Sequence, residues 1–385
     1  MAFALVPQLP AHVDRPALVQ PAPREVSFGR VRGTVGAGTA RVVVLVDGER
    51  RADAQVDGPR FDLRVKLPMR DVELRVVAED ALGNHAETRV GPVLGLPAAE
   101  AGAAARTHED PGLKRKVDDL VDGFAGIAAV YVENLETGAG TAWNARAHFP
   151  AASTVKLAIA IEVLRTLDGK PEQGSSLNSL LSLMLIDSDN EAANELLAWL
   201  GGSATGGAEQ VNELLAALDV DDTHLYGGFL VANPGPIPLT IEREPEFEGK
   251  YTTAWDLAQL HRDVHLAAGG AGPLTRIDGD FTASDARFLL WTLAHSADTG
   301  KLDRYVGTDA IVPHKAGWVT EARHDAGIVY TPEGAFVAVV MTYTGSDAGI
   351  ASDELAGRVA QAARERFEAE REEAGGAGAT TSVEG

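Results

Sequence analysis

The stretch HFPAASTVKLAIAIEVL, residues 148–164, places a lysine inside an otherwise apolar helical pattern. Its aliphatic residues form an almost continuous apolar surface, which predicts a buried helix over 153–167. Ser153 and Lys156 stand one turn apart at the beginning of that helix. A buried ammonium group is costly unless it has partners or loses its proton. The pair is therefore either a catalytic unit, or a helix-capping serine followed by a lysine that reaches solvent.

The composition of the 385-residue chain favours a globular protein with more than one domain. The formal charge of −22 argues against nucleic acid or an anionic membrane as a partner. The chain has no cysteine, which excludes disulfides and thiol chemistry. Only eight of its 34 basic residues are lysines, so a lysine one turn after a serine is less readily explained by chance.

The first part of the chain predicts a small all-β domain. Residues 1–24 are rich in proline and are expected to be extended, with no standard signal peptide and no transmembrane span. Residues 25–94 alternate apolar and polar side chains between turn signals such as Asp47-Gly48, which predicts an antiparallel β-sandwich. Residues 95–112 are rich in alanine and glycine and are expected to form a linker.

Residues 113–370 predict an α+β domain. A helix and a β-hairpin come first, a block of helices follows, and three apolar strands and a last helix close the domain. An antiparallel sheet built from both ends of the domain, with a helical block inserted between them, accounts for this order. Residues 371–385 are expected to be a disordered tail.

Two further polar motifs interrupt apolar segments of this domain. Ser188-Asp189-Asn190 separates two helical segments, and could either cap the second helix or carry chemistry. Lys315-Ala316-Gly317 lies on an apolar strand, where a lysine often guards a sheet edge and a glycine allows close approach of a ligand.

In the order S-x-x-K, S-D-N and K-x-G, these three motifs resemble the signature of the penicillin-recognising serine hydrolases. The flanking segments MLIDSDNEAANELLAWLG and HKAGWVTEARHDAGIVYT resemble the class A β-lactamase catalytic domain, over about residues 113–366. The segment VVAEDALGNHAETRV resembles the closing strands of bacterial immunoglobulin-like modules. The expected fold is thus a β-lactamase/transpeptidase-like domain preceded by an immunoglobulin-like sandwich.

The resemblance implies a role for each motif residue. Ser153 would be the nucleophile and Lys156 the base that activates it, while Ser188 would pass a proton to the leaving nitrogen. The backbone N–H groups of Ser153 and Trp318 would form the oxyanion hole. Asn190 and Lys315 complete the implied catalytic set, Asn190 by holding the substrate amide and Lys156, and Lys315 by supplying positive potential for a substrate carboxylate. The residues expected to bind substrate are Ala316, Gly317 and Tyr226.

Two departures from the family pattern bear on activity. Ala316 stands where the family usually has Thr or Ser, so one hydroxyl contact to a substrate carboxylate is missing; Arg323 or His324 could replace it. No acid stands at 226–228, where the family's deacylating glutamate is expected. Glu246 is the candidate for that role, and the alternative is that it belongs to a solvated acidic loop.

The first functional hypothesis is a β-lactamase that opens the β-lactam amide through an acyl-enzyme on Ser153. The alternatives are a penicillin-binding DD-peptidase or esterase with slow deacylation, and an inert binding module. The expected substrate is a small β-lactam or a peptidoglycan-like peptide or ester, with no metal and no cofactor. The family implies a location outside the cytoplasm, although no signal peptide is recognised, and the oligomeric state stays open.

Overall fold

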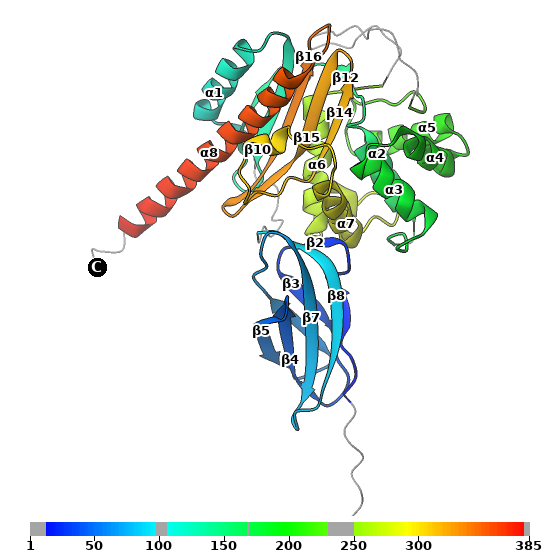
Figure 1. Ribbon diagram of the computed structural model, residues 1–385, viewed down its shortest axis with the longest axis vertical. Helices are drawn as coiled ribbons and strands as arrows, with labels where there is room; N and C mark the ends of the chain where they lie inside the picture. The colour runs from blue at the N-terminus through cyan, green and yellow to red at the C-terminus, as the bar shows by residue number, and fades with distance from the viewer. Residues whose placement is uncertain (1–12, 98–105, 168, 230–249, 381–385) are drawn as a thin grey trace, which may run out of the picture. The chain divides into compact units, whose positions relative to one another are not determined.

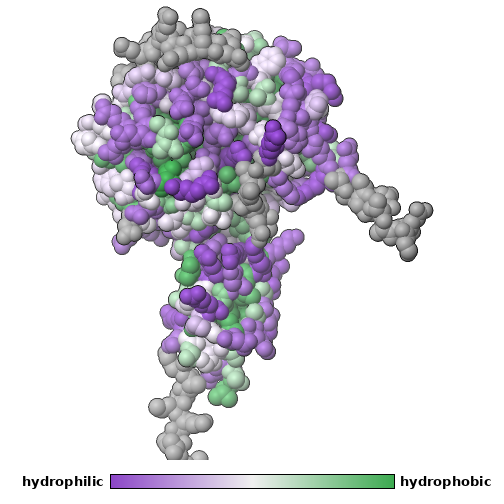
Figure 2. Space-filling model, turned by 180° about the vertical axis from the view of Figure 1, so that it is seen from behind, coloured by the Kyte–Doolittle hydropathy of each residue, from purple (hydrophilic) through white to green (hydrophobic). Residues whose placement is uncertain are grey.

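The computed structural model describes residues 13–97, 106–167, 169–229 and 250–380. It divides the chain into two compact units, Met1–Ala98 and Ala99–Gly385, drawn in Figure 1. Seen from the side opposite to Figure 1, hydrophilic residues cover most of the surface and apolar residues are scattered (Figure 2). Among the described helices, none is both long enough and apolar enough to cross a membrane.

The first unit consists of two β-sheets that share one apolar core. Strands β2, β8, β7, β4 and β5 form one sheet, and β1, β3 and β6 form the other. Alternate residues of both sheets, such as Val31, Phe61 and Val76, are buried in this core. The strands are Ala17–Gln20 (β1), Glu25–Ser27 (β2), Arg30–Thr34 (β3), Thr39–Val46 (β4), Glu49–Gln55 (β5), Arg60–Arg64 (β6), Asp71–Asp80 (β7) and His85–Gly95 (β8).

The second unit is built on a six-stranded sheet with the order β14-β15-β16-β10-β11-β9. Along β10, Val130 and Val132 face a core shared with α1 and α8, whereas Ala129 and Tyr131 face a core shared with α6. Helices therefore cover both faces of the sheet (Figure 1). The strands are His108–Glu109 (β9), Ile127–Asn134 (β10), Ala139–Trp143 (β11), His314–Val319 (β14), Ala322–Thr331 (β15) and Gly334–Tyr343 (β16).

The helical block lies between the two halves of this sheet in the chain order. Its central helix α2 is buried from Lys156 to Leu164, as its continuous apolar pattern predicts. A short pair of strands, β12 (Phe149–Pro150) and β13 (Tyr251–Thr252), joins the beginning of α2 to the segment before α6. The helices are Pro111–Asp122 (α1), Lys156–Thr166 (α2), Ser176–Ile186 (α3), Asn190–Gly201 (α4), Ala204–Ala217 (α5), Ala254–Ala268 (α6), Pro273–Thr275 (η1), Ala283–Ala294 (α7), Leu302–Arg304 (η2) and Ile350–Thr380 (α8).

The α+β prediction is confirmed, and three expected boundaries differ from the structure. The segment 1–24 includes β1, which pairs with β3, because an edge strand tolerates neighbouring prolines. The expected linker 95–112 includes β9, which pairs with β11. The expected tail from 371 continues helix α8 through Thr380, although only its first residues, Arg371 to Ala374, are good helix formers and glycines follow.

Candidate active site

Ser153 lies in a tight turn that leads directly into α2. The hydroxyl and backbone N–H of Thr154 both donate to the carbonyl of Ala151, at 2.6 and 3.1 Å. Ala152 has φ +47, a left-handed conformation that is strained for a non-glycine residue and concentrates at functional sites. The helix itself begins at Lys156, three residues later than the sequence predicts. Ser153 is half-buried, and Lys156 is fully buried.

The ammonium group of Lys156 is held by the Ser188-Asp189-Asn190 step. It donates to the backbone carbonyl of Ser188 at 2.5 Å and to Oδ1 of Asn190 at 2.7 Å. Asp189 caps α4 by accepting from Ala192 N–H at 2.7 Å, so the step is both a helix cap and a lysine-binding site. Ser188 has φ +59, a second strained non-glycine residue at this site.

Ser188 also connects this group to the third motif. Lys315, on β14 at the edge of the sheet, donates to the hydroxyl of Ser188 and to the carbonyl of Ala316, each at 2.9 Å. Ser188 therefore accepts a hydrogen bond from Lys156 at its backbone carbonyl and one from Lys315 at its hydroxyl. The structure brings together three motifs that lie far apart in the sequence.

Gly317 allows β14 to approach the turn that carries Ser153. A Cβ atom at Gly317 would lie 2.7 Å from the backbone nitrogen of Ser153 and 2.9 Å from that of Thr154. Any side chain there would clash with the backbone. The next residue on β14, Trp318, is 63% exposed at the sheet edge, beside the proposed oxyanion hole.

Burial and neighbouring cations weaken the basicity of Lys156 and Lys315. Burial and the neighbouring Lys315 lower the pKa of Lys156 to about 7, although Asp189 opposes the shift. Burial lowers the pKa of Lys315 to about 8, against the attraction of Asp298 and Asp325. Near neutral pH, Lys156 is thus partly a neutral amine, while Lys315 stays mostly charged.

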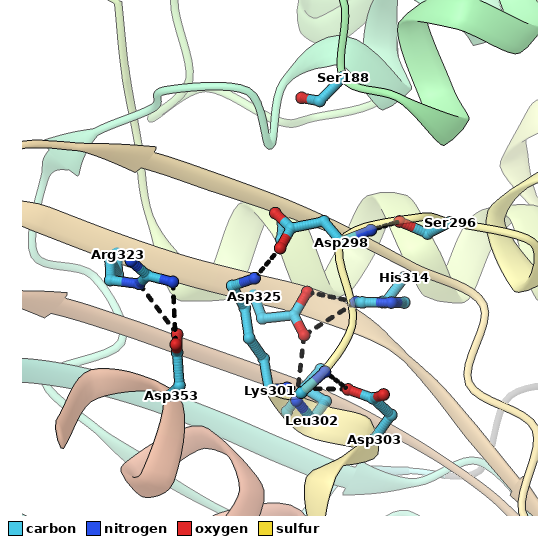
Figure 3. Close-up of polar contacts among 12 residues, drawn as sticks. Ser188, Ser296, Asp298, Lys301, Leu302, Asp303, His314, Arg323, Asp325 and Asp353 are labelled. Carbon is cyan, nitrogen blue, oxygen red and sulfur yellow. Dashed lines mark hydrogen bonds and ion pairs between the residues drawn. The ribbon is translucent and has the colours of Figure 1, made fainter. Parts of the chain in front are cut away.

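A charged network that includes Asp298, Lys301 and Asp325 lies on the sheet and on the segment before β14 (Figure 3). Its aspartates favour the charged form of Lys315. Asp325 on β15 accepts from His314 at 2.8 Å and from the backbone N–H of Leu302 at 3.1 Å. Lys301 pairs with Asp298 in the same segment. These contacts fix the loop before β14 against the sheet, and they place two carboxylates where they favour the charge of Lys315.

The two residues proposed to replace the missing hydroxyl at Ala316 are engaged elsewhere, which corrects the sequence-based expectation. Arg323 makes two 2.9 Å hydrogen bonds to Asp353 at the beginning of α8, away from Ser188 (Figure 3). His324 is buried and its Nε2 contacts the carbonyl of Pro150 at 2.8 Å. Because they are consecutive residues of β15, their side chains point to opposite faces of the sheet, and each has a protein partner there.

Two residues that the sequence did not reveal lie beside Lys156. The ring centre of Phe229 is 4.7 Å from the Nζ of Lys156 and 4.7 Å from the Nζ of Lys250. The scarcity of lysine was the one signal that could have drawn attention to Lys250. Tyr226 is half exposed and packs on His224, with ring centres 4.4 Å apart.

Glu246 lies outside the described residues, so its proposed role as deacylation base stays a prediction. Within the described ranges, no group of three or more His, Asp or Glu side chains is arranged to hold a metal ion. Among the described residues, Lys156 contacts the carbonyl of Ser188, the amide of Asn190 and the ring of Phe229, and its pKa is influenced by one aspartate and two lysines.

The three motifs of this chain meet where a sheet edge faces a helical block. Motifs of this kind are typical of the penicillin-recognising serine hydrolases. The chain belongs to the β-lactamase enzyme family, whose family model matches residues 112–173 and 168–367. No curated protein matches the chain.

Solved structures show the same fold. PBP-A, in a mutant form solved as an acyl-enzyme complex with penicillin G, is 23% identical, with a TM-score of 0.54 over 68% of this chain and 98% of that one. A β-lactamase from Sphaerobacter thermophilus is 22% identical, with a TM-score of 0.52 over 67% and 97%. A class A β-lactamase from Mycobacterium abscessus is 16% identical, with a TM-score of 0.53 over 66% and 99%. The predicted family and β-lactamase-like fold are confirmed, and the immunoglobulin-like character of the first unit stays a prediction.

Proposed function

We propose that the protein is a serine hydrolase that opens β-lactams through an acyl-enzyme on Ser153. The observation that carries the proposal is the position of Ser188, which bonds Lys156 through its carbonyl and Lys315 through its hydroxyl. Such an arrangement connects a base, a proton relay and a cation for a substrate carboxylate in one hydrogen-bonded group.

Each residue has a defined step in the proposed reaction. The neutral amine of Lys156 takes the proton of Ser153, whose Oγ attacks the lactam carbonyl carbon. The backbone N–H groups of Ser153 and Trp318 stabilise the oxyanion of the tetrahedral intermediate. Ser188 then delivers its hydroxyl proton to the lactam nitrogen as the bond from that nitrogen to the carbonyl carbon breaks, leaving an ester on Ser153. The proton that Lys156 took from Ser153 passes back to the hydroxyl of Ser188, so both side chains return to their starting states. Water hydrolyses this ester and releases the opened product.

The second candidate function is that of a penicillin-binding enzyme, in which the ester on Ser153 forms but is hydrolysed slowly. Among the described residues, Phe229 lies against the ammonium group of Lys156, and Lys250 lies over the same ring. Neither side chain is a carboxylate. A cation and an aromatic ring do not accept a proton from water, so neither activates water for deacylation. The acyl-enzyme described for a PBP-A mutant is consistent with this candidate.

The test is the hydrolysis of benzylpenicillin and nitrocefin by the purified full-length chain. Ser153→Ala is expected to abolish turnover, whereas the control Ser179→Ala, on the exposed face of α3, is expected to leave it unchanged. Turnover that survives Ser153→Ala would refute the assignment of the nucleophile. A burst of one equivalent followed by very slow turnover would favour the penicillin-binding candidate over the β-lactamase.

A further inference from the structure

Lys250 lies next to the nucleophile turn and reaches toward Lys156. Its backbone carbonyl accepts from the N–H of Ala151 at 2.9 Å, two residues before Ser153. Its half-buried ammonium group donates to the carbonyl of Gly228 at 2.5 Å and lies over the ring of Phe229. Among the described residues, this hydrogen bond uses one of the three N–H donors of the ammonium group.

The wall formed by Phe229 and Lys250 is fixed to helix α4. Asn194 accepts from the backbone N–H of Phe229 at 2.6 Å and donates to its carbonyl at 2.9 Å. Asn194 stands one turn after Asn190, which holds Lys156, so a single face of α4 positions both Lys156 and the wall. Two asparagines of one helix, Asn190 and Asn194, thus hold Lys156 and Phe229, and Lys250 lies over the ring of Phe229.

Lys156 lies within electrostatic range of both Lys250 and Lys315. Neighbouring aspartates favour the charges of Lys156 and Lys315, whereas burial is the cause that lowers the pKa of Lys250. When Lys156 is neutral and acts as the base, Lys315 and Lys250 are the two cations of this group that can bind an anionic ligand.

The two outer lysines contact different parts of the site. Lys315 donates a hydrogen bond to the hydroxyl of Ser188, the proposed proton donor to the leaving nitrogen, and this contact associates it with the leaving half of a substrate. Lys250 is joined instead to the segment that precedes Ser153, and its ammonium group lies over the ring of Phe229.

We infer that Lys250 binds a second carboxylate, carried on the acyl half of the substrate, so that the preferred acyl donor is dianionic. This inference rests on the proposed function, because it assigns the two halves of the substrate by the acylation of Ser153. Lys250 then acts as a specificity-determining residue. The third lysine also offsets the repulsion that a chain of net charge −22 exerts on a dianion.

A matched pair of penicillins tests the inference. Carbenicillin differs from benzylpenicillin by one carboxylate on the acyl side chain. The measured quantity is the ratio of their second-order acylation rate constants for Ser153, followed by intact mass in the full-length protein. The wild type is expected to prefer carbenicillin, and Lys250→Gln is expected to lower the ratio about tenfold, as for the loss of one charge-assisted hydrogen bond.

Controls separate this role from a structural one. Lys250→Arg keeps the cation and is expected to keep the preference, whereas Lys116→Gln, an exposed lysine on α1, is expected to change neither rate constant. A fall of the wild-type ratio between low and high salt is a second readout that needs no variant. A ratio that is insensitive to both Lys250→Gln and salt would overturn the inference and leave the proposed function intact. Failure of both penicillins to acylate Ser153 would refute the proposed function, and the inference with it.

Discussion

Lys156 and Lys315 place two titrating ammonium groups around Ser188, and each must be in a different state for acylation. Lys156 acts as a base only when it is neutral, so the acylation rate should rise as the pH increases through its pKa of about 7. Lys315 attracts a carboxylate only when it is charged, so the rate should fall as the pH increases through its pKa of about 8. We expect a narrow bell-shaped profile of benzylpenicillin acylation against pH.

The charge of the neighbouring Lys250 gives a further prediction, which concerns the pKa of Lys156. This charge disfavours a second charge on Lys156, so Lys250→Gln should raise the pKa of Lys156 and move the acidic limb to higher pH. Stopped acylation reactions at a series of pH values measure the limb, with Lys116→Gln as the control. A limb that does not move, or that moves to lower pH, would contradict the electrostatic role of Lys250.

Gly317 gives a second prediction for a single residue. Gly317→Val should push β14 away from the backbone of Ser153 and lower the acylation rate by at least about 10²-fold, the loss associated with one oxyanion donor. Gly123→Ala is the control, because a Cβ atom there meets only ordinary contacts and its φ is −80. Wild-type acylation rates in a folded Gly317→Val protein would show that the close approach is not needed.

The motif residues could be located from the sequence because each stands at a fixed place relative to a helix or strand. Lys156, Ser188 and Lys315 are joined by hydrogen bonds, and their catalytic roles stay a prediction. Phe229 and Lys250 could not be found in this way, since the position of Phe229 depends on the side chain of Asn194 in another element. The engagement of His324 could not be predicted either, because its partner is the carbonyl of Pro150, which lies far away in the sequence.

At the scale of elements, the first and last helices of the second unit share an apolar core and are also joined by a partly buried ion pair. Asp110 caps α1 by accepting from the N–H of Leu113 at 2.7 Å and pairs with Arg366 of α8 at 2.9 Å. Asp110→Ala should lower the free energy of unfolding by about 2 kcal/mol, because it removes a helix cap and one of the carboxylate partners of Arg366.

The same two helices provide the control for this prediction. Lys116 and Glu365 form an exposed pair between α1 and α8, so Lys116→Ala should change the stability by no more than about 0.5 kcal/mol. Chemical denaturation of both variants measures the difference. Equal effects of the two substitutions would contradict the importance of the partly buried pair.

Helices and strands were predicted well where their apolar pattern is long, and less well at their ends. The sequence left open whether Ser188 or Asp189 caps α4, and the structure assigns the cap to Asp189. The beginning of α2 moves from Ser153 to Lys156 because the nucleophile occupies a strained turn that no propensity specifies. The short edge strand β1 lacks a long apolar pattern.

At the scale of the whole molecule, every described residue of the candidate site belongs to the second unit, Ala99–Gly385. A chain of residues 99–385 should therefore fold and acylate at a rate within about twofold of the full-length protein. Acylation kinetics and thermal unfolding of the shortened chain measure this. A folded but inactive shortened chain would show that the first unit contributes to the site.

The acylation of Ser153 is the claim on which the functional account depends. The most direct measurement is the intact mass of the full-length protein after mixing with excess benzylpenicillin, followed by peptide mapping. The account predicts a gain of one penicillin mass, mapped to Ser153 and absent in Ser153→Ala. No adduct on folded wild-type protein at any time, or an adduct that persists in Ser153→Ala, would contradict it.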